Sequence, residues 1–293
     1  MTRPAPDPAN TPQVELWNGA AGRKWVDRQP EQDVVLAPVS AALFARAAAA
    51  PGERVVDVGC GCGGTTFALG RRVGPAGHVL GVDVSAAMLE RARELAPAGL
   101  PVDLVLADAT VHEFDAGAAD LLFSRFGVMF FADPARSFAN LRRALRPGGR
   151  ACFACWREAR ANPWLMVPLQ AAYRHVPRLP EVGPDDPGPF SFAREDRVRR
   201  VLEAAGFVAI ELEQVDLRLD VAAGGGLDNA VQTALRIGPA SRALDGQPPD
   251  AIVAATASIR AALEPYVDGA RVVLAGSTWI VTALNPGPAT PGS

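Results

Sequence analysis

An apolar stretch that ends in an acid and runs directly into a glycine-rich turn constrains this chain most. Residues 54–66 read RVVDVGCGCGGTT. Gly59, Gly61 and Gly63 lack a Cβ, so the backbone there can adopt positive φ and bring its N–H groups close to a ligand. The sequence therefore predicts a cofactor site at the end of a strand.

The glycines alone leave the cofactor open. Gly59, Gly61 and Gly64 also satisfy the G-x-G-x-x-G pattern of dinucleotide-binding folds, and Asp83 follows at about the distance that this pattern expects. An NAD-dependent oxidoreductase is therefore one alternative. Two further features favour another ligand, namely Asp57 two residues before the first glycine and a later acid, Asp108.

Each of these three acids closes a predicted strand. Asp57 precedes Asp83 by 26 residues, and Asp83 precedes Asp108 by 25 residues. Such intervals suit βα units, in which a helix returns the chain to the next parallel strand. The carboxyl ends of the strands then share one rim, where open α/β sheets bind their ligands. One ligand could meet all three acids.

Several motifs together resemble the class I S-adenosylmethionine (SAM) dependent methyltransferases, in particular the ubiquinone and menaquinone biosynthesis C-methyltransferase group. The matching segments, which lie within residues 14–156, are 55–63 (VVDVGCGCG), 81–85 (GVDVS), 106–109 (LADA), 120–131 (DLLFSRFGVMFF) and 145–150 (LRPGGR). The resemblance implies an α/β fold: a Rossmann-like seven-stranded, mostly parallel sheet with helices on both faces, an antiparallel last strand and a helical cap over the active site.

The resemblance also implies SAM as the cofactor and S-adenosylhomocysteine as the product. Asp57 would bind the methionine amino group, Asp83 both ribose hydroxyls, and Asp108 the adenine amine, while Met88 packs on the adenine. Ser124, Arg125 and Phe126 would lie under the sulfonium. The full set of expected cofactor-binding residues is Trp17, Trp25, Asp57, Gly59, Cys60, Gly61, Asp83, Val84, Met88, Asp108, Ala109, Ser124, Arg125 and Phe126.

Trp17 and Trp25 precede the first strand, where many relatives carry a helix that folds over the cofactor. They are candidate lid residues, or else two large side chains that anchor a helix on the core. The domain organisation that we expect is a flexible tail at 1–13, a helical lid at 14–50, the SAM-binding core at 51–157, a proline-rich flap at 158–192, the rest of the core with inserted helices at 193–285, and a flexible tail at 286–293.

Composition limits the partners. The 293 residues are 49% hydrophobic and carry a net charge of −3, which gives no general attraction for nucleic acid. The N-terminus has no apolar signal region, and the alanine-rich run 37–50 is too short to span a bilayer. We therefore expect a cytoplasmic protein without stable membrane insertion, and its oligomeric state stays open.

Four cysteines do not predict a metal site. Cys152 and Cys155 lie in one predicted strand, where their odd spacing sends them to opposite faces, and a structural zinc needs four ligands. Cys60 and Cys62 lie between the glycines of the turn. We interpret Cys152 and Cys155 as small buried residues rather than a redox or metal pair, whereas Cys60 and Cys62, which lie in the turn, leave a functional role more open.

The chemistry of the acceptor is less constrained. Methyl transfer is an in-line displacement that needs alignment and, for a weak nucleophile, a base. His112, Tyr173 and His175 are the candidate bases, each with the alternative of a loop or packing residue. Apolar residues of the flap, among them Trp164, favour an apolar or aromatic small-molecule acceptor. Methylation at carbon, oxygen, nitrogen or sulfur, and a SAM-binding protein with other chemistry, remain alternatives.

Overall fold

A twisted sheet lies at the centre of the molecule, and Asp83 and Asp108 lie at the carboxyl ends of two of its strands. The computed structural model describes residues 5–287. Seven of its eight strands lie in the order β3-β2-β1-β4-β5-β8-β6, and the eighth, the short strand β7, pairs with β8 outside that order. Their bounds are β1 Arg54–Val58, β2 His78–Asp83, β3 Val102–Leu106, β4 Ala119–Arg125, β5 Leu145–Trp156, β6 Val208–Asp220, β7 Val267–Asp268 and β8 Arg271–Leu284.

The direction of the strands matches the prediction. The pairs β1 with β2, β1 with β4, β2 with β3 and β4 with β5 are parallel, whereas β8 runs antiparallel to both β5 and β6. The predicted seven-stranded, mostly parallel sheet with an antiparallel last strand is thus confirmed. Strand order reverses between β1 and β4, so the carboxyl ends of these strands open a crevice at that point.

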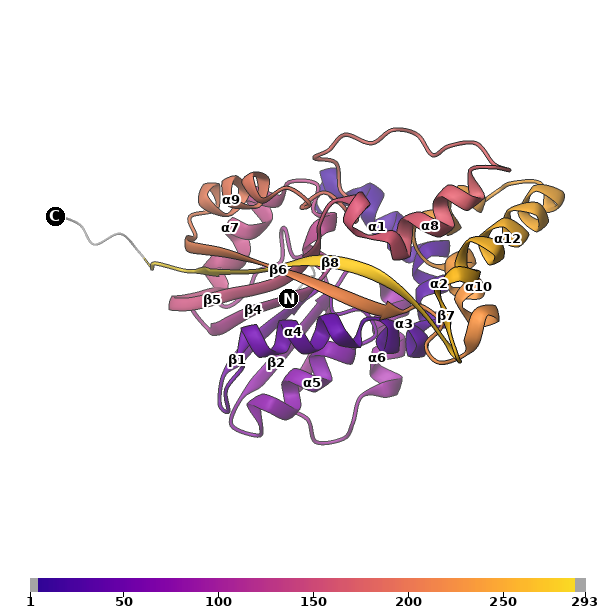
Figure 1. The fold of residues 1–293 in the computed structure, drawn as a ribbon. Coiled ribbons are helices and arrows are strands. Elements are labelled where there is room, and N and C mark those ends of the chain that lie inside the picture. The colour runs from indigo at the N-terminus through magenta and orange to yellow at the C-terminus, as the bar shows by residue number, and fades with distance from the viewer. Residues whose placement is uncertain (1–4, 288–293) are drawn as a thin grey trace.

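Helices cover both faces of the sheet (Figure 1). Helices α4 (Ala37–Ala47) and α5 (Gly64–Val73) pack on one face, and α7 (Pro134–Ala144) and α9 (Glu195–Ala204) pack on the other, while α6 (Ala86–Leu95) connects β2 to β3. Helix α7 begins at a favourable site, because the Asp133 side chain accepts a hydrogen bond from the Arg136 N–H and Pro134 occupies the first turn. Phe123, Phe138 and Phe153 are almost fully buried between the layers.

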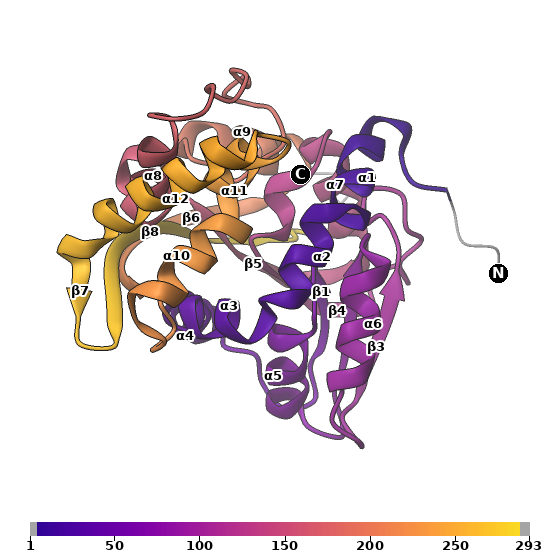
Figure 2. The same ribbon diagram turned by 90° about the vertical axis from the view of Figure 1, so that its right-hand side faces the viewer.

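A second group of helices lies beyond the carboxyl ends of the parallel strands (Figure 2). It consists of α8 (Pro163–Ala172) and of three helices inserted between β6 and β8, namely α10 (Gly226–Arg236), α11 (Gly238–Leu244) and α12 (Pro249–Leu263). Inserted helices are expected within residues 193–285, without individual bounds, and these three lie there. Gly238 and Pro239 look like a break, yet a proline in the first turn is compatible with a helix start.

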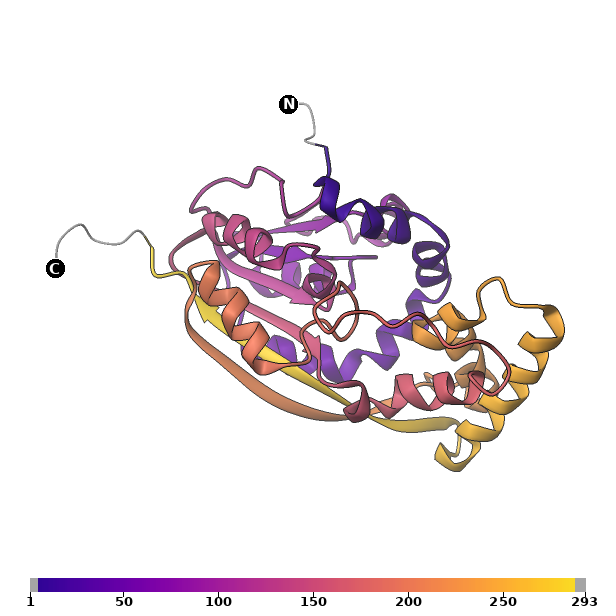
Figure 3. The ribbon, with the colours of Figure 1, turned by 90° about the horizontal axis from the view of Figure 1, so that it is seen from above.

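The N-terminal helices approach this second group, as Figure 3 shows from above. They are α1 (Thr11–Asn18), α2 (Ala20–Asp27) and α3 (Gln29–Val35), preceded by a 3-10 helix at Pro8–Asn10. Three further 3-10 helices are Gly127–Phe130, Ala159–Ala161 and Glu264–Tyr266. None of the helices within residues 5–287 is both long and apolar enough to cross a membrane.

The expected N-terminal tail is shorter than predicted. Residues 8–13 are helical, and Asp7 and Asn10 are buried. The Asn10 Oδ1 accepts a hydrogen bond from the Ala132 N–H at 3.3 Å, and the Asp7 N–H donates to Asp108. These two bonds hold the segment against the core. Residues 1–4 and 288–293 of the two predicted tails lie outside the described residues.

Candidate functional site

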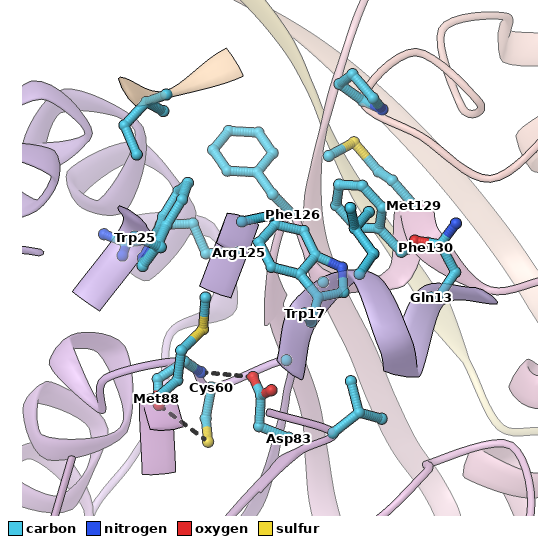
Figure 4. A pocket seen from close by; sticks show the side chains of 18 of the residues that line it. Gln13, Trp17, Trp25, Cys60, Asp83, Met88, Arg125, Phe126, Met129 and Phe130 are labelled. Carbon is cyan, nitrogen blue, oxygen red and sulfur yellow. Dashed lines mark hydrogen bonds between the residues drawn. The ribbon is translucent and has the colours of Figure 1, made fainter. Parts of the chain in front are cut away.

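A cavity of about 270 Å³ opens at the carboxyl ends of β1, β2 and β4 (Figure 4). Its floor is the glycine turn, and its walls come from the N-terminal helices, from α8 and from the junction of α10 and α11. Twelve of the fourteen predicted cofactor residues line it: Trp17, Trp25, Gly59, Cys60, Gly61, Asp83, Val84, Met88, Asp108, Ala109, Arg125 and Phe126. Segments far apart in the sequence therefore form one chamber.

The three glycines of the turn have positive φ values of 69°, 55° and 86° at Gly59, Gly61 and Gly63. A Cβ on Gly59 would lie 2.6 Å from the Gly127 Cα, and a Cβ on Gly63 would lie 2.5 Å from the Phe67 ring. A Cβ on Gly61 would meet only the Met88 Sδ, at 3.8 Å. Gly59 and Gly63 thus serve packing, whereas Gly61 leaves space in the cavity for a ligand.

Asp83, the last residue of β2, connects the turn to the next helix. One carboxylate oxygen accepts a hydrogen bond from the Gly61 N–H and the other from the Ser85 N–H, both at 2.8 Å. Burial raises the pKa of Asp83, and these backbone donors oppose the rise. Because each carboxylate oxygen can accept more than one hydrogen bond, the side chain fits two neighbouring hydroxyl groups of a ligand.

Asp108 lies two residues beyond β3 and is almost fully buried. Its Oδ1 accepts a hydrogen bond from the Thr110 N–H at 2.9 Å, and its Oδ2 accepts one from the Asp7 N–H at 3.0 Å. The Asp7 carboxylate in turn pairs with Arg136. This contact could not be predicted from the sequence, because 101 residues separate Asp7 from Asp108.

Asp57 and Ser124 differ from the prediction, because neither lines the cavity. One Asp57 oxygen accepts hydrogen bonds from the hydroxyls of Thr65 and Thr66 at 2.8 and 2.7 Å, and burial raises the Asp57 pKa to about 6. The Ser124 hydroxyl donates to the Val58 carbonyl at 2.7 Å. Both side chains therefore support the glycine turn from outside the cavity. Asp57 lies inside β1, which continues through Val58, so its side chain does not reach the rim.

The two predicted lid tryptophans line the cavity and contact each other, with ring centroids 6.3 Å apart in an edge-on arrangement. Trp17 also packs edge-on against Phe130 at 5.1 Å. Its carbonyl accepts a hydrogen bond from the Ser85 hydroxyl at 2.7 Å. The helices that carry the tryptophans are therefore fixed to the rim next to Asp83.

An aromatic wall leads from the glycine turn to the far end of the cavity. Phe126 stacks on Trp156 with centroids 4.1 Å apart, and Trp156 contacts Trp164 at 5.0 Å. Beside this wall, the Arg125 guanidinium pairs with the Asp33 carboxylate at 3.2 Å. Asp33 also lines the cavity, although its sequence context in α3 carries no recognisable motif.

Polar contacts join the N-terminal helices to the inserted helices above this far end. The Arg28 guanidinium donates to Asn229 at 2.7 Å and to Thr233 at 2.9 Å. The Lys24 ammonium donates to the Ser241 hydroxyl at 3.0 Å and pairs with Asp245. These four contacts close one side of the chamber.

None of the three candidate bases lies on the cavity wall. The His112 ring packs edge-on against Phe114 at 4.6 Å. The Tyr173 hydroxyl accepts a hydrogen bond from the Leu179 N–H at 3.3 Å, and the His175 Nε2 lies 2.7 Å from the Ser258 hydroxyl. None of the three residues predicted as a general base therefore lines the cavity.

Fold and site together define an α/β protein with a ligand chamber at the carboxyl ends of its parallel strands. A family profile described as a methyltransferase domain matches residues 55–149. Nocamycin O-methyltransferase of Saccharothrix syringae is 32% identical over 192 residues, which are 62% of this chain and 69% of that protein. The chain therefore belongs to the class I SAM-dependent methyltransferase family, and its cofactor is SAM.

Other similar proteins agree. Aklanonic acid methyltransferase DauC of Streptomyces sp. strain C5 is 36% identical over 134 residues, 43% of this chain and 61% of that protein. Demethylmenaquinone methyltransferase of Staphylococcus aureus is 28% identical over 172 residues, 55% of this chain and 70% of that protein. The predicted resemblance to the menaquinone group is thus confirmed.

A solved structure shares the fold. Haemonchus contortus phosphoethanolamine N-methyltransferase 2, in complex with phosphomonomethylethanolamine and S-adenosylhomocysteine, superposes with a TM-score of 0.53 at 19% identity, covering 85% of this chain and 52% of that one. At this identity the likeness concerns the fold alone.

Proposed function

We propose that this protein transfers the methyl group of SAM to an apolar or aromatic small molecule and releases S-adenosylhomocysteine. The observation that carries the proposal is the single chamber in which the Gly61 space and the Asp83 carboxylate lie at one end and the aromatic wall at the other. The names of the similar proteins support a small-molecule acceptor, since they refer to nocamycin, aklanonic acid and demethylmenaquinone.

We assign the adenosine part of SAM to the end that contains Asp83, Met88 and Asp108. Asp83 would bind the ribose hydroxyls, and Met88, which is 5% exposed, would pack on the adenine. The Ala109 N–H and the remaining acceptor capacity of Asp108 would meet the polar edge of the base. Val84, Cys60 and the two lid tryptophans would complete this half of the site.

The methionine part would follow the glycine turn towards Arg125. We replace Asp57 in this role by the Asp33 and Arg125 pair, because both of its members line the cavity whereas Asp57 does not. A carboxylate next to a guanidinium matches the ammonium and carboxylate of an amino acid. Asp57 and Ser124 would act indirectly by holding the turn.

SAM, when bound, supplies an electrophilic methyl group on a sulfonium. The chain contributes orientation and exclusion of water, since the N-terminal helices cover the chamber and the Phe126 face can stabilise a nearby cation. Since no predicted base lies on the wall, acceptors that are nucleophilic without deprotonation by the protein should react best.

The test is calorimetric titration of the purified protein with S-adenosylhomocysteine and, separately, with NAD, followed by detection of S-adenosylhomocysteine after incubation with SAM and a panel of aromatic acceptors. Saturable S-adenosylhomocysteine binding and acceptor-dependent product support the proposal. Binding without product for any acceptor favours a SAM-binding protein with other chemistry, and binding of NAD alone favours an oxidoreductase. We also propose that the protein is cytoplasmic, which cell fractionation would check. Its oligomeric state is to be determined by size-exclusion chromatography.

A further inference from the structure

Four cationic side chains line the cavity, namely Lys24, Arg125, Arg236 and Arg242. Two of them are neutralised within the protein, since Arg125 pairs with Asp33 and Lys24 pairs with Asp245. Arg236 and Arg242 make no ion pair and no side-chain hydrogen bond with any residue in 5–287. Two positive charges thus remain at the mouth of the chamber.

The position of these two arginines suits a ligand. Arg236 is the last residue of α10, and Arg242 lies in the last turn of α11. A cation at a helix C-terminus stabilises the helix, which accounts for a basic residue in each place. It does not account for both side chains bordering the same cavity. Asp33 and Asp245, the acids on this part of the wall, already have cationic partners.

The aromatic wall adjoins the junction of α10 and α11, because Trp164 lines a smaller pocket together with Ile237 and Pro239. Phe126, Trp156 and Trp164 form it, and all three are at least nine-tenths buried. A ligand that uses both features has a flat apolar body and an anionic group at its edge. Arginine suits such a group well, because its planar guanidinium can donate two parallel hydrogen bonds to a carboxylate.

We propose that the acceptor of this enzyme is an aromatic carboxylate whose ring lies along the Phe126–Trp156–Trp164 wall and whose carboxylate is bound by Arg236 and Arg242. This inference rests on the proposed function, because it concerns the acceptor half of the same chamber. According to this proposal, the enzyme selects its acceptor by the negative charge of the acceptor as well as by its apolar area.

The experiment compares two probes of the same shape, 2-naphthoate and 2-naphthamide, by titration calorimetry on the protein saturated with S-adenosylhomocysteine. We expect 2-naphthoate to bind at least about fivefold more tightly, since hydrogen bonds to charged groups are the stronger ones. The preference should shrink when the salt concentration rises from about 0.02 M to about 0.5 M, because the arginines are exposed and therefore screened.

Substitutions test whether the two arginines cause the preference for 2-naphthoate. The double variant Arg236→Gln with Arg242→Gln should bind both probes equally, and its affinity for S-adenosylhomocysteine should not change. The matched control is Arg71→Gln, because Arg71 also lies in the last turn of a helix and is exposed, but does not line the cavity. This control should keep the wild-type preference.

Three results would overturn the inference: no binding of 2-naphthoate, equal binding of the two probes to the wild type, or an unchanged preference in the double variant. A protein that does not bind S-adenosylhomocysteine would instead count against the proposed function. The two titrations can then be repeated without cofactor, so that the arginines are tested on their own.

Discussion

Replacing Gly61 by alanine separates a ligand role of the glycine turn from a purely conformational one. Gly61 has a φ of 55°, and its added Cβ would point into the cavity with only the Met88 Sδ within 4 Å. Gly52 provides the matched control, since its φ is 85° and an added Cβ would meet nothing within 4 Å. Gly52 does not line the cavity. Both substitutions therefore strain the backbone, but only one adds an atom to the site.

The expected magnitudes follow from these two terms. A residue with a Cβ in the left-handed region costs about 1–2 kcal/mol, so both variants should unfold at a temperature lower by about 2–8 °C. An extra methyl group in a well-packed space costs about 1–3 kcal/mol. For Gly61→Ala this corresponds to a loss of about 5-fold to about 150-fold in affinity for S-adenosylhomocysteine.

The assay is a pair of measurements on each protein, thermal unfolding without ligand and calorimetric titration with S-adenosylhomocysteine. Gly52→Ala should lose stability and keep its affinity. Gly61→Ala should lose both. Wild-type affinity in Gly61→Ala would refute our placement of the cofactor along the turn, and a parallel loss of affinity in Gly52→Ala would show that the effect is conformational.

Three further predictions concern the acids and the thiols. Asp83→Ala should weaken S-adenosylhomocysteine binding by about 10-fold to about 150-fold, from the 1.5–3 kcal/mol of a charged hydrogen bond; titration beside Asp103→Ala, an exposed acid of β3, checks this, and equal affinities of the two variants would remove Asp83 from the ribose site. Burial raises the pKa of Asp57 to about 6, so its carboxyl favours the folded state most at low pH, and this contribution is lost as the pH rises through about 6. Between about pH 4 and pH 7 the free energy of unfolding should therefore fall in the wild type by roughly 3 kcal/mol more than in Asp57→Asn. Identical urea-unfolding profiles of the two proteins at both pH values would contradict a raised pKa of Asp57. Burial raises the pKa of Cys62 to about 12, so iodoacetamide should label it slowly at about pH 8 in the native protein and rapidly in urea, as mass spectrometry would show.

The local part of the site could be predicted from the sequence. Asp83 is the last residue of β2 and Asp108 lies two residues beyond β3, and the glycine pattern indicates where the backbone can approach a ligand. Parallel strands bring their carboxyl ends together whatever the rest of the chain does. The same reasoning was wrong for Asp57, because β1 continues past it to Val58 and its side chain does not line the cavity. The two threonines that follow the glycines, Thr65 and Thr66, could have indicated its true partners.

The long-range contacts of the chamber could not be predicted. Asp33 and Arg125 are 92 residues apart, and Asp7 reaches Asp108 over 101 residues. Such contacts depend on how whole helices pack, and no periodicity or motif reports them. The same holds for α11, whose start at Gly238 and Pro239 resembles a break in the chain.

The contacts of Lys24 and Arg28 have a consequence for how the protein is made. Their partners lie 201 to 221 residues later in the chain. A growing polypeptide therefore exposes the glycine turn and the three acids long before α10 and α11 leave the ribosome and close the chamber. The chamber can therefore close over the methyl donor only after α10 and α11 are made, and bound donor should stabilise the docking of the N-terminal helices on them.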